Sequence, residues 1–266
     1  MKHGASNIAW PAEADTSAWS ILKASGINHV ELAPSRVWPN WHLVNGTDCR
    51  RSLADAGLAV CSLQAILFQK PELRLFGTAA EELALLDHLR FCADLAAELG
   101  AARAVFGAPK NRDRGELSSE DAFGRASQFF ARAGEEYAKR GVMIGFEPNP
   151  VEYGCNFGTT ASEAAKLVRR VASPGFGLHL DTACVLLAGE DIAVQIRENA
   201  DILCHFHASE PQLETFGNPR AGHEAAAKAL REIGYPGIVV LEMRAAIPPL
   251  PALAEAVACL RDIYGT

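Results

Sequence analysis

The chain has 266 residues, of which 49% are hydrophobic and 21% are charged, and this balance favours one large folded domain over a disordered chain. The net charge of −7 argues against nucleic acid or an anionic membrane as the partner, because phosphate binding depends on clustered lysine and arginine. The chain has no apolar run of membrane-spanning length and no signal-peptide core after Met1, and its seven scattered cysteines predict reduced thiols in a cytoplasmic protein.

One pattern recurs along the chain: a short apolar strand, a loop, and an alanine-rich amphipathic helix that usually ends at glycine. Thr78 and Thr160, each three residues before a glutamate, are typical of helix starts. The predicted strands cover residues 7–10, 29–32, 58–63, 104–106, 142–146, 176–180, 202–206 and 238–241. The predicted helices cover residues 17–23, 50–55, 81–99, 119–139, 162–170, 192–199, 224–233 and 251–263.

Eight such units predict an α/β fold, a (β/α)8 TIM barrel formed as a single domain by residues 1–266. An open, doubly wound parallel sheet is the alternative. The sequence has no GxGxxG motif after the first strand, which argues against dinucleotide binding, and it has no Walker A motif.

Four polar residues stand at the ends of successive strands in the second half of the chain. Glu147, Asp181, His207 and Glu242 are separated by 34, 26 and 35 residues, about one strand–helix unit each. Because active sites of TIM barrels lie at the carboxyl ends of the strands, these side chains are expected to converge. Carboxylates with one imidazole suit a divalent cation. The alternative is that they are solvated strand ends or, for Asp181, a helix N-cap.

Other polar residues follow the strands closely enough to reach a substrate. Lys110 and Arg112 could hold a phosphate or carboxylate, although a solvated loop is the alternative. Substrate contacts are also expected from Glu152, His205 and His223, of which His205 could instead be a buried neighbour of His207 and His223 could lie on the surface. Two residues at the ends of early strands could hydrogen-bond hydroxyls: Glu31 and Gln64.

These residues give the chain a resemblance to the xylose isomerase-like superfamily of TIM barrels. Within it, the chain is similar to the sugar phosphate isomerases and epimerases, which include ketose 3-epimerases, hydroxypyruvate isomerase and inosose dehydratase. The resemblance rests on VFGAPKNR (residues 105–112), EPNPVEYGCNF (147–157), GLHLDT (177–182), HFHASE (205–210) and YPGIVVLEMR (235–244).

The resemblance implies one divalent ion, Mn, Mg, Co or Zn, bound by Glu147, Asp181, His207 and Glu242. It further implies that Glu147 and Glu242 exchange a proton with the carbon next to a metal-bound carbonyl of a carbohydrate or keto-polyol. A homo-oligomer is common among such proteins.

Two departures from the ketose 3-epimerases stand out. Their substrate-binding histidine, three residues after the metal aspartate, is Cys184 here, and their arginine shortly after the metal histidine is missing. Both argue against a free ketohexose as the substrate. The alternatives are an inosose-type dehydratase on the same site, an endonuclease IV-like DNA repair enzyme, which needs more histidines, and a non-catalytic metal-binding barrel.

Overall fold

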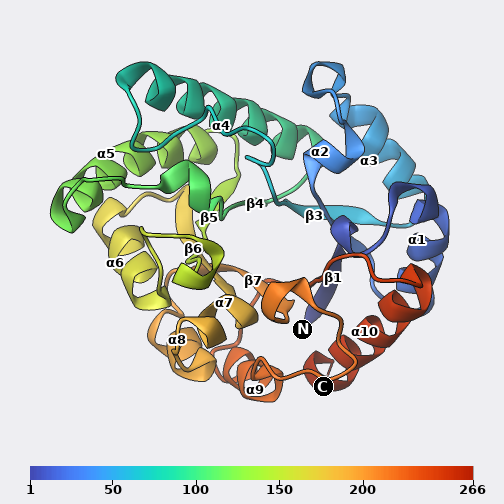
Figure 1. Cartoon of the computed structure of the whole chain (residues 1–266). Helices are drawn as coiled ribbons and strands as arrows, with labels where there is room; N and C mark the ends of the chain where they lie inside the picture. Colours follow the sequence, from blue (N-terminus) through green and yellow to red (C-terminus); the bar gives the residue numbers. More distant parts are fainter. Residues whose placement is uncertain (266) are drawn as a thin grey trace.

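The structure is a computed structural model that describes residues 1–265 and, at His42, the backbone alone. Eight parallel strands form a closed barrel in which consecutive strands pair and β1 pairs with β8 (Figure 1). This confirms the predicted (β/α)8 TIM barrel. The strands are β1 (Lys2–Ser6), β2 (His29–Leu32), β3 (Ala59–Leu63), β4 (Arg103–Phe106), β5 (Met143–Phe146), β6 (Phe176–Asp181), β7 (Leu203–Ser209) and β8 (Ile238–Glu242).

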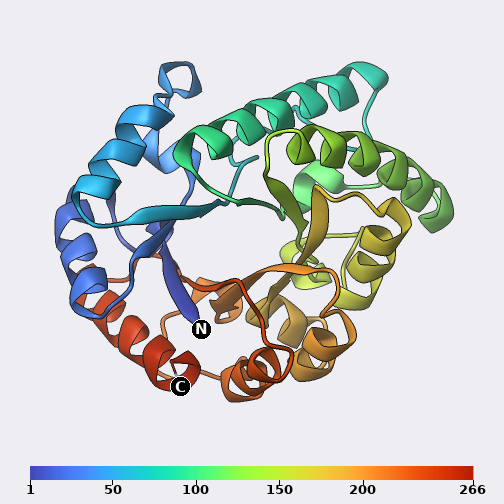
Figure 2. The ribbon, with the colours of Figure 1, turned by 180° about the vertical axis from the view of Figure 1, so that it is seen from behind.

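The helices surround the barrel, and α10 packs beside α1 to close the ring (Figures 1 and 2). The α-helices are α1 (Asp15–Ala24), α2 (Pro34–Val37), α3 (Gly46–Asp55), α4 (Ala79–Leu99), α5 (Ser119–Ala138), α6 (Ala161–Val171), α7 (Thr182–Leu187), α8 (Ile192–Glu198), α9 (His223–Glu232) and α10 (Pro249–Tyr264). Short 3-10 helices lie in the connections: η1 (Asn7–Ala9), η2 (Ala12–Ala14), η3 (Trp41–Leu43), η4 (Pro109–Arg112), η5 (Val151–Tyr153) and η6 (Pro211–Leu213). Within residues 1–265, the structure contains no helix long and apolar enough to cross a membrane.

An aromatic cluster fixes the strands that carry the middle of the site. Phe106 of β4, Phe146 of β5 and Phe176 of β6 pack on Phe130 of α5, with ring centroids 4.7–5.3 Å from that of Phe130. All four side chains are buried, and such aromatic pairs add to the stabilisation that burial gives. The cluster therefore holds the carboxyl ends of β4 and β5 and the beginning of β6 against α5.

The predicted first strand at residues 7–10 is wrong. The strand is Lys2–Ser6, and residues 7–9 form η1, where the Ser6 side chain accepts a hydrogen bond from Ile8 N. β1 was not predicted because its inner residues are small, and small residues have a low preference for strands. Gly4 leaves little room for a side chain, since a Cβ there would lie 3.2 Å from Ile238 Cγ2 and 3.4 Å from His29 Cβ.

The predicted helix signals are largely confirmed. Thr78 and Glu81 form a complete capping box at α4, and Gly100 ends that helix at φ 77°. Thr160 caps α6, but the Glu163 carboxylate accepts from Thr159, so the box is only half formed. Two short helices, α2 and α7, were not predicted, because each is too brief to show a helical period. All seven cysteines are free.

Candidate metal centre and active site

Four side chains converge where β5, β6, β7 and β8 reach the carboxyl end of the barrel. Glu147 directly follows β5, Asp181 and Glu242 end their strands, and His207 lies within β7. One ligand atom from each of Glu147, Asp181 and His207 lies within 4.8 Å of the others. Glu242 joins them, with its Oε2 atom 3.2 Å from His207 Nδ1. The arrangement predicted from strand ends is therefore present.

The His207 ring lies between two carboxylates. Its Nδ1 atom faces Glu242, and its Nε2 atom lies 2.9 Å from Glu31 Oε1, which β2 brings into the barrel interior. The other Glu31 oxygen lies 2.9 Å from His205 Nε2. All three side chains are buried. Glu31, expected to bind hydroxyls, instead binds two histidines and leaves His207 Nδ1 toward the candidate metal ligands.

Negative charge is concentrated at this point. Burial, together with the nearby carboxylates of Glu147 and Glu242, raises the pKa of Asp181 from 3.8 to about 7. Burial also raises the pKa of Glu147. Asp181 Oδ1 accepts from Cys184 N at 2.7 Å and its Oδ2 accepts from Ser209 Oγ, so Asp181 is an N-cap of α7 as well as a candidate ligand. Buried carboxylates that repel one another fit a divalent cation among them.

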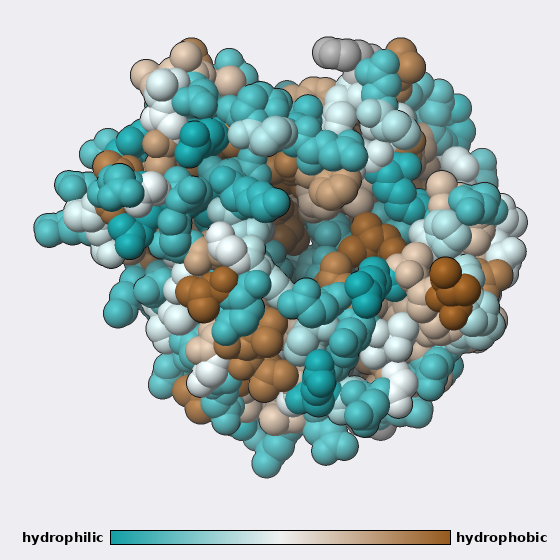
Figure 3. Space-filling view, in the orientation of Figure 1, coloured by the Kyte–Doolittle hydropathy of each residue, from teal (hydrophilic) through white to brown (hydrophobic). Residues whose placement is uncertain are grey.

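The convergent residues border a cavity at the centre of the barrel, where the surface is hollowed (Figure 3). Its larger part has a volume of about 630 Å³ and reaches from Glu147, His207 and Glu242 to the loops after β3 and β4. A smaller part, about 310 Å³, lies on the side of β6 and β7. Both parts are lined by Glu147, Asn149, Tyr153 and Glu242, so these residues stand at the junction.

The fold and this residue set have counterparts among known proteins. Residues 19–263 match the family described as xylose isomerase-like TIM barrel. The chain belongs to this family. A ketose 3-epimerase of Arthrobacter globiformis is 25% identical to it over 189 residues, which make up 70% of this chain and 63% of that relative. The match therefore spans less than two thirds of the relative.

Two solved structures illustrate how widely this barrel is shared. A D-psicose 3-epimerase, crystallised in the presence of D-fructose, superposes with a TM-score of 0.84 at 19% identity, covering 100% of both chains. A 3-keto-D-glucoside 4-epimerase from E. coli superposes with a TM-score of 0.79 at 18% identity, covering 98% of this chain and 99% of that one. At such low identity these likenesses show the fold.

Among the residues expected to bind substrate in this xylose isomerase-like barrel, Gln64 and Lys110 line the cavity. Arg112, two residues on, is fully buried: it donates to Glu147 O at 2.7 Å and to Asn149 Oδ1 at 3.0 Å, and it lies over the Phe146 ring. Its guanidinium therefore supports the loop after β5 from behind and does not reach the cavity.

The other three substrate candidates also lie outside the cavity lining. Glu152 is exposed on η5, and His205 is buried against Glu31. His223 is buried at the start of α9, with its ring nitrogens 2.8 Å from Glu210 Oε1 and 2.9 Å from the Tyr264 hydroxyl. We therefore leave Glu152, His205 and His223 out of the substrate site.

Sequence reasoning passed over Asn149, which lines the cavity beside Glu147. Asn149 Nδ2 donates to Glu147 Oε2 at 3.1 Å, and the Tyr153 hydroxyl accepts from Gln212 N at 3.0 Å, which ties the loop after β5 to the loop after β7. Asn149 follows Glu147 by two residues, and that proximity to a strand end is the signal that could have found it.

Proposed function

We propose that this chain is a divalent-metal-dependent sugar isomerase or epimerase. The observation that carries the proposal is the convergence of Glu147, Asp181, His207 and Glu242 on the cavity, around the place where its two parts meet. Membership of the xylose isomerase-like TIM barrel family supports it. So do the names of relatives that share its fold or sequence, a ketose 3-epimerase, a D-psicose 3-epimerase and a 3-keto-D-glucoside 4-epimerase.

The donor set suits one Mn, Mg, Co or Zn ion, because it combines carboxylate oxygens with a single imidazole nitrogen. Glu147, Asp181 and Glu242 would each supply an oxygen and His207 its Nδ1. When bound, such an ion polarises a substrate carbonyl and makes the adjacent C–H more acidic. Burial, together with the carboxylates of Glu147 and Glu242, raises the pKa of Asp181, and this crowding of buried carboxylates is the feature of this chain that supports a bound cation.

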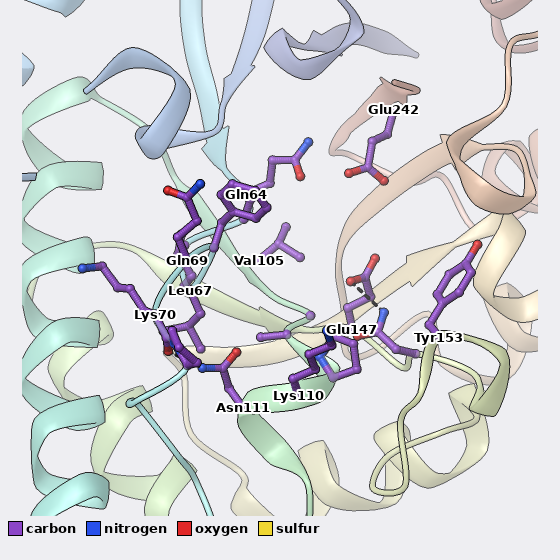
Figure 4. A pocket seen from close by; sticks show the side chains of 18 of the residues that line it. Gln64, Leu67, Gln69, Lys70, Val105, Lys110, Asn111, Glu147, Tyr153 and Glu242 are labelled. Carbon is purple, nitrogen blue, oxygen red and sulfur yellow. Dashed lines mark hydrogen bonds between the residues drawn. The ribbon is translucent and has the colours of Figure 1, made fainter. Parts of the chain in front are cut away.

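We infer that Glu147 and Glu242 move the proton. They enter the cavity from β5 and from β8, and both line its two parts (Figure 4). A proton removed by one carboxylate can therefore be returned by the other to the opposite face of the same carbon, or to a neighbouring carbon. Burial raises the pKa of Glu147, which makes it a stronger base than an exposed glutamate. Asn149 holds one oxygen of Glu147 in place.

Elemental analysis of the purified protein tests the metal. We expect about one divalent ion per chain in the wild type, and none in an Asp181→Ala/His207→Ala double variant, because two of the four ligands are then missing. Glu152→Ala is the control, since it removes an exposed carboxylate from the loop after β5. Several zinc ions per chain would favour the endonuclease-like alternative, and no ion after reconstitution would contradict the proposal.

Hydrogen exchange tests the chemistry. The metal-loaded protein is incubated with keto-sugars and inososes in deuterated water, and deuterium next to the carbonyl is followed by NMR. We expect exchange in the wild type and in Glu152→Gln, and a loss of at least about a hundredfold in Glu147→Gln and Glu242→Gln. The products distinguish isomerisation, epimerisation and dehydration. Full exchange in Glu147→Gln would contradict the assigned role.

A further inference from the structure

The two parts of the cavity differ in character. The larger part, which we call the β3–β4 lobe, lies between residues 64–71 after β3 and residues 105–111 at and after β4. Apolar atoms dominate its lining, and Ile66, Leu67 and Val105 contribute to it. Figure 4 shows the two ends of this lobe: Glu147, Tyr153 and Glu242 on one side, and Leu67, Gln69, Lys70 and Asn111 on the other.

Several polar side chains of the β3–β4 lobe are already used by the protein. Both amide hydrogens of Asn111 are donated to backbone carbonyls, to Lys70 O at 2.7 Å and to Leu73 O at 2.8 Å. Gln64 Nε2 donates to Ser6 Oγ. The Lys70 ammonium lies 4.8 Å from the centroid of the Trp41 ring. These contacts hold the wall together, and they leave Asn111 with no amide hydrogen for the hydroxyls of a sugar.

The smaller part of the cavity, the β6–β7 lobe, is more polar. Its lining includes Asp181, Cys184, Ser209 and Gln212 beside the junction residues. Its volume of about 310 Å³ suits a small polar ring, whereas the β3–β4 lobe, at about 630 Å³, lies within the roughly 300–1,000 Å³ of pockets for drug-sized ligands. One substrate that fills both lobes therefore has a polar part and a larger apolar part.

We propose that the substrate is a glycoside: a keto-sugar, bound at the junction and in the β6–β7 lobe, that carries an apolar or aromatic aglycone in the β3–β4 lobe. The sugar half of this inference rests on the proposed function. An aryl group buried against Ile66, Leu67 and Val105 is favoured by the hydrophobic effect. A polyhydroxylated chain placed against these three apolar side chains would lose water there without gaining hydrogen-bond partners from them.

The test is a binding measurement on the metal-loaded protein with phenyl and methyl 3-keto-β-D-glucosides, which differ only in the aglycone. Isothermal titration calorimetry is expected to show phenyl glucoside binding at least about tenfold more tightly. Leu67→Ser should bring the two affinities within about twofold of each other, and the isosteric Val105→Thr should reduce the difference without a change of volume. Leu186→Ser, on α7 and outside both lobes, is the matched control and should keep the wild-type preference.

Circular dichroism melts show whether the variants are folded. If Leu67→Ser is not folded, the affinities of Val105→Thr for the two glucosides decide the test. Equal affinities for the two glucosides, binding of neither, or tighter binding of free ketoses or ketose phosphates would overturn the glycoside assignment. None of these results bears on hydrogen exchange with free ketoses, which tests the proposed function separately. A preference for the phenyl glucoside that persists in both Leu67→Ser and Val105→Thr would also overturn the glycoside assignment, because the aglycone would then lie elsewhere.

Discussion

Glu31 and His207 meet inside the barrel, with Glu31 Oε1 2.9 Å from His207 Nε2, although β2 and β7 are not neighbours in the sheet. A carboxylate behind a ligand histidine fixes which ring nitrogen carries the proton and which faces the metal. Here Nε2 faces Glu31 and Nδ1 faces Glu242, so the ring already turns one nitrogen toward a candidate metal ligand. We infer that Glu31 positions His207 in the candidate metal centre.

Glu31→Gln is expected to weaken manganese binding by about 10- to 100-fold, because the charge that orients His207 is lost while the side-chain volume is kept. Isothermal titration calorimetry on the metal-free protein measures this effect. Glu210→Gln is the control: it also removes a buried contact between a glutamate and a histidine, His223, away from the cavity. Equal affinity in the wild type and Glu31→Gln, or equal loss in both variants, would contradict the role of Glu31.

Asp181 predicts how the stability of the metal-free protein depends on pH. Its pKa is raised from 3.8 to about 7 by burial and by Glu147 and Glu242. Between these values the folded state holds a proton that the unfolded state has released, so the free energy of unfolding falls as pH rises from about 4 to 7. Urea denaturation should show this fall to be smaller in Asp181→Asn and in the metal-loaded wild type. Identical pH profiles for the metal-free wild type and Asp181→Asn would contradict it.

The absence of a side chain at Gly107 leaves space for the Glu147 carboxylate. A Cβ at this position would overlap Glu147 Oε2, and the backbone of Gly107 is not in the left-handed region. Gly107→Ala should therefore fold but displace the carboxylate and lower manganese affinity by about tenfold or more. Gly124→Ala in α5, where a Cβ meets nothing within 4 Å, is the control and should leave affinity unchanged. Wild-type affinity in Gly107→Ala would show that Glu147 has room to move.

The four strand-end residues could be predicted because a parallel barrel brings the carboxyl ends of its strands together. Only the positions of the strands in the sequence are needed to apply this rule. It correctly predicted that Glu147, Asp181, His207 and Glu242 lie together at the carboxyl end of the barrel. The role of Glu31 could not be predicted in the same way, because its partners lie on β7, 174 and 176 residues further along the chain. Only closure of the barrel makes them neighbours.

The direction in which a loop side chain points could not be predicted from the sequence either. Lys110 and Arg112 stand two residues apart on η4, yet Lys110 is exposed at the cavity and Arg112 is fully buried behind it. Charge and position in the sequence suggested one cationic pair. The 3-10 turn separates the two side chains, and carbonyl and amide acceptors at Glu147 and Asn149 hold the guanidinium away from the solvent.

This separation predicts opposite effects for two matched substitutions. Arg112→Met should lower the free energy of unfolding by about 2 kcal/mol or more, because it leaves Glu147 O and Asn149 Oδ1 without their donor. Lys110→Met should change it by no more than about 0.5 kcal/mol, as is usual for an exposed side chain. Urea denaturation of both variants in the same metal-free state measures the difference. If Lys110→Met were the more destabilising change, the buried guanidinium would not be what holds the loop after β5 in place.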